Sequence, residues 1–355
     1  MTTTLVIAAA PVRLPSGPAF PPGRHGFGGT PPIRAILQQD EDCTKPSTTV
    51  AEAKPWTRSA LGLTRSWRLS RGAAVLVAVV DTGVDGSTPA PADQVDAVGA
   101  ASKDCVGHGS FAAGLIAAAP QPGTGVVGIA PAARVLSVSL DAPDALTEAV
   151  AYATKHDALV VAPAAPDIAP SESGSSRPDP TAWPYFLAFI PQVLFVADYG
   201  PQGGRPEGAP QPFAPDLAAP GDSVVSVGPG GKGHFIGSGS SLAAANVAGA
   251  AALVRARSPE LSAGQTADRL EHSAYPSDVP RLDLYVALSS VGGADRATAP
   301  RGASAQVELP EPHSQVPRTR AVAIAASAAI FLAPLVAAMV VVPRGRARSW
   351  RSAGR

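Results

Sequence analysis

A short run of small residues, residues 236–249, contains the serine best placed to act as a nucleophile. Ser241 lies in the Gly-Ser-Ser at the end of that turn and leads without interruption into a helix-forming segment. A serine at a helix N-terminus is close to free backbone N–H groups and to the positive end of the helix dipole, which stabilise an oxyanion. The run therefore predicts a site for nucleophilic attack.

Two further stretches supply the groups that would activate a serine. His108 lies between two glycines just before another small-residue helix, and Asp81 ends an apolar run with the length of a buried strand. A serine becomes nucleophilic when a base removes its proton, and the imidazole base needs a carboxylate to fix its tautomer. Asp81, His108 and Ser241, in that order, predict a serine hydrolase.

The elements that would position these side chains alternate along the chain. Strands are expected at residues 74–80, 134–140, 158–162, 193–197 and 223–227, and helices at 108–119, 144–155 and 241–255. Such alternation predicts an α/β fold with a mostly parallel sheet and helices on both faces. Asp81 would then end a strand while His108 and Ser241 begin helices, at the edge where such sheets carry their sites. Ser262 and Gln265 predict a capping box for a later helix.

The chain resembles the subtilisin-like serine proteases, and most closely the mycosins, the membrane-anchored proteases of type VII secretion systems. The Asp-Thr-Gly at 81–83, the His-Gly-Ser at 108–110 and the Gly-Ser-Ser-Leu-Ala-Ala at 239–244 match the three signature blocks, with Ser240 in place of the usual threonine. The resemblance implies the subtilisin fold, a triad of Asp81, His108 and Ser241, a polypeptide substrate, and no cofactor or metal. Ser110 and Ser238 are interpreted as structural.

The asparagine that completes the oxyanion hole in this family is not found at a matching position. Asn246 is the only asparagine, and it lies inside the helix that follows Ser241. Two alignments compete for the block, and they offer Asp167 or Asp198. A carboxylate repels an oxyanion unless it is protonated, and loss of one donor costs about a hundred- to a thousandfold in rate. A glutamine or the Tyr199 hydroxyl are alternative donors.

The middle of the domain, between residues 134 and 197, is also one βα unit shorter than in a typical mycosin. Two functions therefore remain open at this point. The complete triad favours an endopeptidase, whereas the missing asparagine and the short middle favour a catalytically weakened scaffold that supports a secretion membrane complex. A truncated product that folds poorly is a third alternative.

Cys43 and Cys105 are the only cysteines, and they are either unrelated thiols or a pair. Mycosins are similar in having one cysteine in the N-terminal extension and one just before the His-Gly motif. The resemblance therefore implies a disulfide that ties the extension across the domain, in an oxidising compartment.

The charged residues predict neither a nucleic-acid partner nor a calcium site. With 28 basic and 28 acidic residues the chain has no net charge, so nothing predicts binding to nucleic acid. Four acidic residues between the first two motifs fit no calcium-loop spacing and are interpreted as solvated: Asp85, Asp93, Asp96 and Asp104.

The ends of the chain differ in composition from the domain. Six segments are expected: a poorly ordered region or degenerate signal segment (1–39), an N-terminal extension (40–73), the peptidase domain (74–291), a linker (292–320), a transmembrane helix (321–342) and a basic tail (343–355).

Arginines on the two sides of the expected membrane helix predict its orientation. The tail carries Arg344, Arg346, Arg348, Arg351 and Arg355, against Arg318 and Arg320 on the domain side. Positively charged flanks stay in the cytoplasm. The sequence thus predicts a single-pass cell-membrane protein with an extracytoplasmic peptidase domain and a cytoplasmic tail.

Overall fold

The computed structural model describes residues 2–6, 29–35, 41–88, 95–98, 102–139, 145–167, 193–231 and 233–290. The expected linker (292–320), transmembrane helix (321–342) and basic tail (343–355) lie outside these residues. Within the described ranges, no helix has the length and apolar character needed to cross a membrane.

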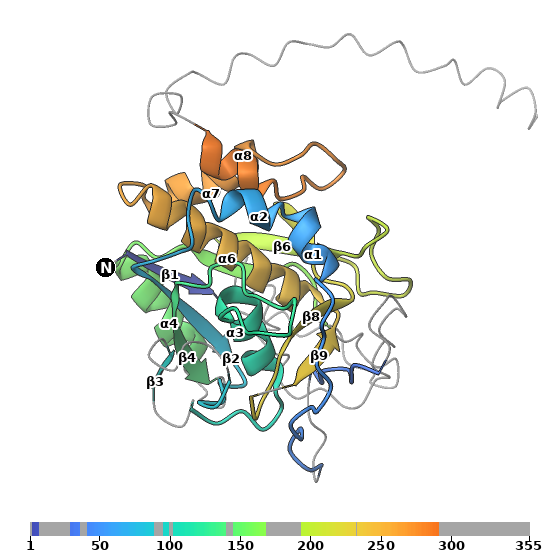
Figure 1. The fold of residues 1–355 in the computed structure, drawn as a ribbon. Coiled ribbons are helices and arrows are strands. Elements are labelled where there is room, and N and C mark those ends of the chain that lie inside the picture. Colours follow the sequence, from blue (N-terminus) through green and yellow to red (C-terminus); the bar gives the residue numbers. More distant parts are fainter. Residues whose placement is uncertain are drawn as a thin grey trace, which may run out of the picture. The chain divides into compact units, whose positions relative to one another are not determined.

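A parallel sheet forms the centre of the domain (Figure 1). Its seven described strands lie in the order β3 (Val95–Val98), β4 (Arg134–Ser139), β2 (Val75–Asp81), β1 (Thr2–Val6), β5 (Val160–Pro163), β6 (Val193–Tyr199) and β7 (Leu217–Pro220). Every neighbouring pair is parallel. The predicted α/β architecture is confirmed.

Helices cover both faces of this sheet. One face packs against α3 (His108–Ala117) and α6 (Ser240–Arg257), and the other against α4 (Ala145–Lys155). Successive side chains of a strand point to opposite faces. Val77 and Val79 accordingly join the core under α3 and α6, while Ala78 and Val80 join the smaller core under α4. The strand that ends in Asp81 is therefore held from both sides.

The central position between β2 and β5 is occupied by the N-terminal strand β1. Thr2 pairs with Val75 at one side, and Leu5 pairs with Val160 at the other. A single described helix, α4, connects β4 to β5. The expectation of a poorly ordered N-terminal region is wrong for Thr2–Val6, because this Thr-, Leu- and Val-rich run has high strand propensity and finds a neighbour on each side.

A separate antiparallel hairpin consists of β8 (Val224–Val227) and β9 (His234–Gly237). The sequence analysis expected residues 223–227 to belong to the parallel sheet, and that expectation is wrong. The connection contains Gly230 and Gly231, both with positive φ, and such residues form the tight turn that closes a hairpin. Ile33 donates its N–H to Ile236 O at 2.8 Å, so residues 31–33 extend this hairpin.

The extension before β2 is attached to the domain at several points. Its two short helices are α1 (Trp56–Ala60) and α2 (Leu63–Ser66). The indole of Trp56 donates to Ser223 O at 3.1 Å, and the indole of Trp67 donates to Ile129 O at 2.8 Å. Leu61 and Leu63 are buried in the main core. The extension is therefore an integral part of the domain.

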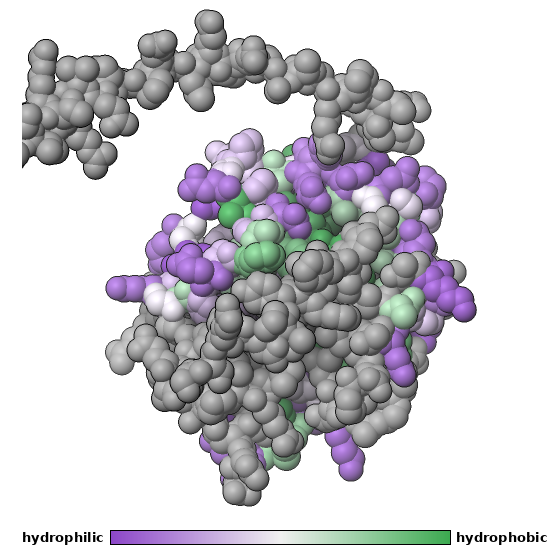
Figure 2. All heavy atoms as spheres, turned by 180° about the vertical axis from the view of Figure 1, so that it is seen from behind, coloured by the Kyte–Doolittle hydropathy of each residue, from purple (hydrophilic) through white to green (hydrophobic). Residues whose placement is uncertain are grey.

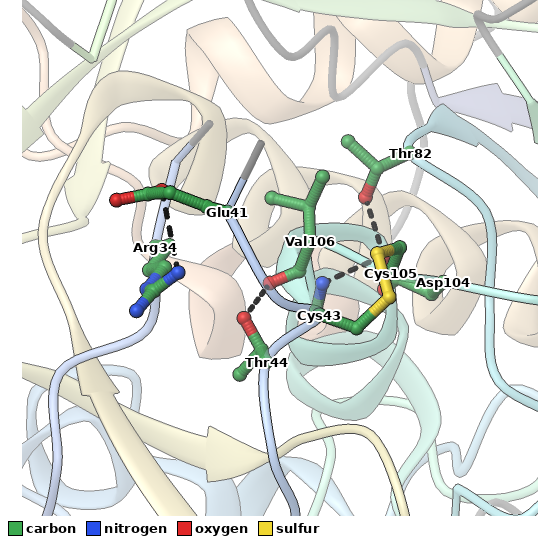
Figure 3. Close-up of a disulfide and its surroundings, with 9 residues drawn as sticks. Arg34, Glu41, Cys43, Thr44, Thr82, Asp104, Cys105 and Val106 are labelled. Carbon is green, nitrogen blue, oxygen red and sulfur yellow. Dashed lines mark hydrogen bonds and ion pairs between the residues drawn. A yellow bond between two sulfur atoms is a disulfide. The ribbon is translucent and has the colours of Figure 1, made fainter. Parts of the chain in front are cut away.

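A disulfide joins Cys43 of the extension to Cys105, as the family resemblance implied (Figure 3). Beside it, Thr44 donates its N–H to Cys105 O at 2.8 Å and its hydroxyl to Val106 O at 2.5 Å. The bond links two segments separated by 62 positions in sequence. It therefore fixes the extension directly upstream of His108.

Two further helices complete the α6 side of the domain, α7 (Ala263–His272) and α8 (Leu284–Ser289). The predicted capping box is present, because Ser262 accepts from the Gln265 N–H and Gln265 accepts from the Ser262 N–H. The surface mixes hydrophilic and hydrophobic side chains on the face seen in Figure 2. The large exposed hydrophobic residues of the described part are Val50, Tyr152, Phe213, Tyr275 and Val286.

Candidate active site

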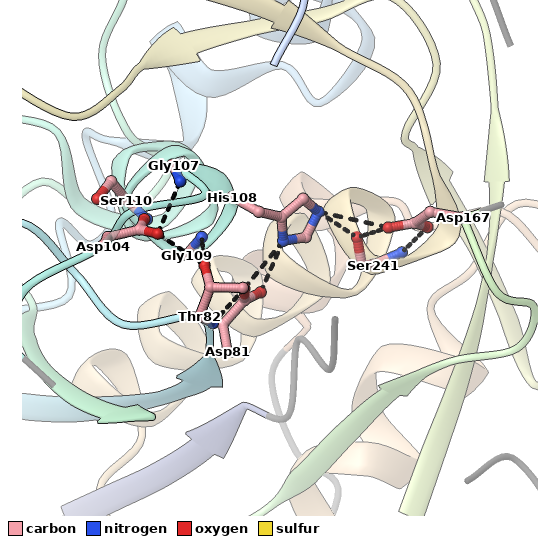
Figure 4. Close-up of polar contacts among 9 residues, drawn as sticks. All are labelled: Asp81, Thr82, Asp104, Gly107, His108, Gly109, Ser110, Asp167 and Ser241. Carbon is pink, nitrogen blue, oxygen red and sulfur yellow. Dashed lines mark hydrogen bonds and ion pairs between the residues drawn. The ribbon is translucent and has the colours of Figure 1, made fainter. Parts of the chain in front are cut away.

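Asp81, the last residue of β2, holds the imidazole of His108. Its two carboxylate oxygens lie 3.0 and 2.8 Å from His108 Nδ1, and Oδ1 also accepts the Thr82 N–H at 2.6 Å (Figure 4). The Asp81 and His108 side chains are buried. A buried carboxylate in this position fixes the tautomer with a proton on Nδ1, which directs Nε2 toward the opposite side of the ring.

His108 is the first residue of α3, and glycines on both sides let the chain approach β2. Gly107 has φ +92°, a conformation that favours glycine. A Cβ added to Gly109 would lie 2.0 Å from Gly83 O, so only glycine permits this contact. The two glycines next to the histidine thus have a geometric role.

Asp104 organises the turn before His108, a role that the sequence analysis missed. Its buried carboxylate accepts hydrogen bonds from the Thr82 hydroxyl at 2.8 Å, the Gly107 N–H at 2.7 Å and the Ser110 N–H at 2.8 Å. Burial raises the pKa of Asp104, although the hydrogen bonds from Ser110 and Gly107 oppose the shift. The interpretation of Asp104 as solvated is therefore wrong, because its nearby donors were not visible in the sequence.

Ser241 is the second residue of α6 and lies next to the imidazole. Its Oγ is 3.1 Å from His108 Nε2, and the side chain is fully buried. The helix begins after Gly239, whose φ of +158° is close to extended backbone. Asp81, His108 and Ser241 thus form one continuous hydrogen-bonded line from β2 through α3 to α6.

Asp167, which follows β5, occupies the other side of Ser241. Its Oδ1 accepts the Ser241 N–H at 3.0 Å, and its Oδ2 accepts a very short hydrogen bond from the Ser241 hydroxyl. The same Oδ2 lies 3.4 Å from His108 Nε2. Of the two aspartates offered by the alternative alignments, the structure brings Asp167 to Ser241.

The other candidate donors lie in separate interactions. Asp198 forms an ion pair with Arg205 at 2.7 Å and accepts from the Ser240 hydroxyl at 2.6 Å. Tyr199 packs with its ring centroid 5.9 Å from that of Trp56. Asn246 donates its side-chain N–H to Pro220 O at 2.8 Å, in agreement with the inference that it is not an oxyanion donor.

The two serines interpreted as structural have structural partners. Ser110 Oγ accepts the Asp85 N–H at 2.9 Å, and Ser238 donates to Asp222 at 2.6 Å. Asp93 lies outside the described residues. In the parts of the chain that the structure covers, no group of three or more His, Cys, Asp or Glu side chains could hold a metal ion.

The electrostatics of the site centre on His108, which lies between two carboxylates. Burial alone lowers the pKa of His108, but the charge of Asp81 and the hydrogen bond and charge of Asp167 outweigh it. The net effect places the pKa of His108 well above its ordinary value. The arrangement therefore favours an imidazolium with Asp81 at Nδ1 and Asp167 near Nε2.

Comparisons with known proteins agree with this geometry. The model of the subtilase family matches residues 72–184 and 196–306. Mycosin-3 of Mycobacterium tuberculosis is 30% identical over 82% of this chain and 84% of its own length, and mycosin-1 of the same organism is 28% identical over 76% and 79%.

Solved structures lead to the same group. The MycP3 protease from a type VII (ESX-3) secretion system superposes with a TM-score of 0.59, at 26% identity, over 79% of this chain and 99% of that one. MycP1 with its N-terminal propeptide removed gives a TM-score of 0.55, at 26% identity, over 67% and 97%. The chain therefore belongs to the subtilase family of serine endopeptidases and, within it, to the mycosins.

Proposed function

We propose that this chain is a membrane-anchored, extracytoplasmic endopeptidase in which Ser241 is the nucleophile, His108 the general base and Asp81 its orienting carboxylate. The observation that carries the proposal is the hydrogen-bonded line from Asp81 through His108 Nδ1 and Nε2 to Ser241 Oγ, with distances of 2.8 and 3.1 Å. These are ordinary hydrogen-bond lengths, so a proton can pass from the serine to the imidazole.

Acyl transfer would proceed in two halves. In the first, the Ser241 proton moves to His108 Nε2, Oγ bonds to the peptide carbonyl carbon, and the carbonyl electron pair moves to oxygen. The C–N bond then breaks, and the leaving amine takes the proton from His108. In the second half, water attacks the ester in the same way, and Ser241 is released with its proton. Asp81 stabilises the imidazolium in both halves.

The proposal includes the cell envelope as the place of action. The Cys43–Cys105 disulfide fits an oxidising compartment. The uncharged residues 321–342 and the arginines beyond them, read from the sequence alone, support an anchor with the domain outside. A relative described as part of a type VII (ESX-3) secretion system supports work beside such a membrane complex.

Labelling with a fluorophosphonate probe tests the chemistry without a known substrate. We would treat the full-length chain in detergent with the probe, beside Ser241→Ala and His108→Ala, and verify folding of each by circular dichroism. Labelling that is lost in both variants is expected. A folded parent protein that stays unlabelled from pH 5 to pH 9 would overturn the proposed endopeptidase activity. A scaffold function would then be the remaining proposal.

Proteolysis of the domain from outside intact cells tests the location. An extracytoplasmic domain is degraded by added protease, while an epitope on the C-terminal tail survives until the membrane is opened. A domain that is protected in intact cells would contradict the proposed orientation.

A further inference from the structure

We propose that Asp167 is a second catalytic residue, which shares one proton with His108 and, when protonated, donates a hydrogen bond to the oxyanion of the transition state. The inference rests on the proposed triad and assigns a function to the position at which the family's asparagine is missing. On this proposal Asp167 takes over the function of the missing asparagine and makes the activity of the site depend on pH.

The position of the Asp167 carboxylate points to this role. Its Oδ1 lies 3.0 Å from the Ser241 backbone nitrogen, the group that would itself donate to an oxyanion. Its Oδ2 contacts both the Ser241 hydroxyl and, at 3.4 Å, His108 Nε2. A group that reaches both the nucleophile and its base also lies where the carbonyl oxygen of a substrate would collect charge.

The protons of the resting site can be assigned from these contacts. Nδ1 of His108 donates to Asp81, since that carboxylate can only accept. The Ser241 hydroxyl donates to Asp167 and therefore has its lone pairs free toward His108 Nε2. Nε2 then carries a proton as well, and the imidazolium lies between two carboxylates. In this state His108 cannot act as a base, so the resting site is inactive.

A proton transfer then activates the site. One proton moves from His108 Nε2 to Asp167 Oδ2, and an imidazolium with a carboxylate becomes a neutral imidazole with a carboxylic acid. No proton enters or leaves the protein in this step. His108 can now take the Ser241 proton, and the Asp167 O–H can turn to the carbonyl oxygen as a donor. A protonated aspartate thus takes the role of the asparagine amide.

The surrounding charges favour this sharing between two groups. Asp81 faces His108 from the end of β2, and Asp104 lies behind it, bonded to Thr82 and to the turn before α3. Asp198, on β6, is compensated by Arg205. No cation other than His108 is bonded to Asp167 in the described part of the chain. Among the described residues, the Asp167 charge is therefore met by a proton on His108 or by its own protonation.

The pair of side chains predicts a bell-shaped pH profile. With two protons on the pair His108 is no base, and with none the ionised Asp167 repels the oxyanion. The single-proton state alone contains the active arrangement, so labelling should fall when the pair gains or loses a proton. A site with an asparagine in place of Asp167 would lose only the alkaline limb, because its donor does not titrate.

The decisive variant is Asp167→Asn, assayed in the full-length chain by the second-order rate constant of fluorophosphonate labelling from pH 5 to pH 10. We expect the parent profile to be bell-shaped and that of the variant to rise to an alkaline plateau. The gain should be largest at alkaline pH, about a hundred- to a thousandfold, the value of one oxyanion donor.

Two matched variants separate the charge from the hydrogen bond. Asp167→Ala removes the charge without supplying a donor, so it should lose the alkaline limb but stay far slower than Asp167→Asn. Asp198→Asn changes the other candidate carboxylate and should keep the bell shape. Folding of each is compared by thermal melting.

The outcomes distinguish this inference from the function on which it rests. Equal labelling and equal pH profiles for the parent and Asp167→Asn would overturn the inference, while loss of labelling in Ser241→Ala would still support the triad. An Asp167→Ala variant as fast as Asp167→Asn would exclude the donor role. Absence of labelling in every folded variant would overturn the triad itself.

Discussion

The two sides of Ser241 are built differently. On the base side, the Asp81 carboxylate holds His108, and Thr82 and Asp104 brace the turn that positions the imidazole. On the oxyanion side, one carboxylate, Asp167, accepts both the N–H and the hydroxyl of Ser241. The base side is arranged as a proton relay requires, whereas the oxyanion side holds the serine at rest. Catalysis in this chain should therefore be limited by the oxyanion side.

Two isosteric substitutions, one at each nitrogen of the imidazole, should have opposite effects. Asp81→Asn removes the carboxylate that fixes the His108 tautomer, and we expect labelling to fall about 10⁴-fold. Asp167→Asn should instead raise it. The labelling rates of both variants, measured at the same pH, test this difference. A fall in both rates would contradict the distinction between the two sides of Ser241.

The strand β1 joins the two sides, since it lies between β2, which ends in Asp81, and β5, which leads to Asp167. Leu5→Pro removes a backbone donor from the middle of the sheet. We expect a loss of about 1–3 kcal/mol in the free energy of unfolding, measured by denaturant titration, because a ladder hydrogen bond is lost. Leu5→Val serves as the control, because a β-branched residue suits a strand. A proline variant as stable as the parent would contradict the central position of β1.

The disulfide supports the base side, because it ends at Cys105, just before the turn of His108. Replacing both cysteines by serine should lower the free energy of unfolding by about 2–4 kcal/mol. The rate of fluorophosphonate labelling of the folded protein should change little, even though the free energy of unfolding falls. Thermal melts of the parent with and without reductant provide the matched control, and an unchanged melting temperature in both would contradict the prediction.

Asp104 tests how far the base side depends on its support. In Asp104→Asn an amide group has to replace a carboxylate that accepts three hydrogen bonds. We expect a loss of about 1–3 kcal/mol of stability. Because burial raises the pKa of Asp104 in the folded chain, the unfolded chain loses that proton more readily. Ionised Asp104 thus opposes folding above its ordinary pKa, and the stability penalty of the variant should shrink as pH rises.

The smallest effect is expected at the buried His234. Its Nδ1 accepts the Ala51 N–H at 3.0 Å, so protonation would break the contact between the extension and β9. Burial lowers the pKa of His234, although the Thr49 backbone opposes the shift. The unfolded chain therefore binds this proton more readily, and stability is lost as pH falls below about 6.5.

A melting series from pH 7.5 to pH 5 measures this loss. His234→Gln keeps an acceptor for Ala51 without titrating, so it should lose part of the acid sensitivity. An identical pH dependence in the parent and His234→Gln would show that His234 has no part in it.

The predictable parts of the fold are those that depend on local patterns. Strands β2, β4, β5 and β6 and helices α3, α4 and α6 lie within a few residues of their expected bounds, because apolar runs and small-residue helices identify them. Strand β1 was not expected, since its partners lie at Val75 and Val160, far away in sequence. Nothing in residues 2–6 alone indicates a central position.

The site follows the same division. Asp81, His108 and Ser241 lie in motifs that can be recognised from the sequence, and the structure brings them together. Asp167 was one of two alternatives, because the sequence does not show how β5 packs beside α6. That packing decides which aspartate contacts Ser241. Asp104 was misread, since its three donors come from both β2 and the α3 turn.

The protonation of His108 is the most direct test of the account, and nitrogen NMR of ¹⁵N-histidine in the full-length chain measures it. Among the six histidines, the His108 signals are identified as those absent from His108→Gln. The account predicts an imidazolium, with both nitrogens protonated, at pH 7.5 in the parent, because the Asp81 and Asp167 charges outweigh burial, and a neutral imidazole at that pH in Asp167→Asn. A neutral His108 in both proteins would contradict the imidazolium that the account assigns to the resting site.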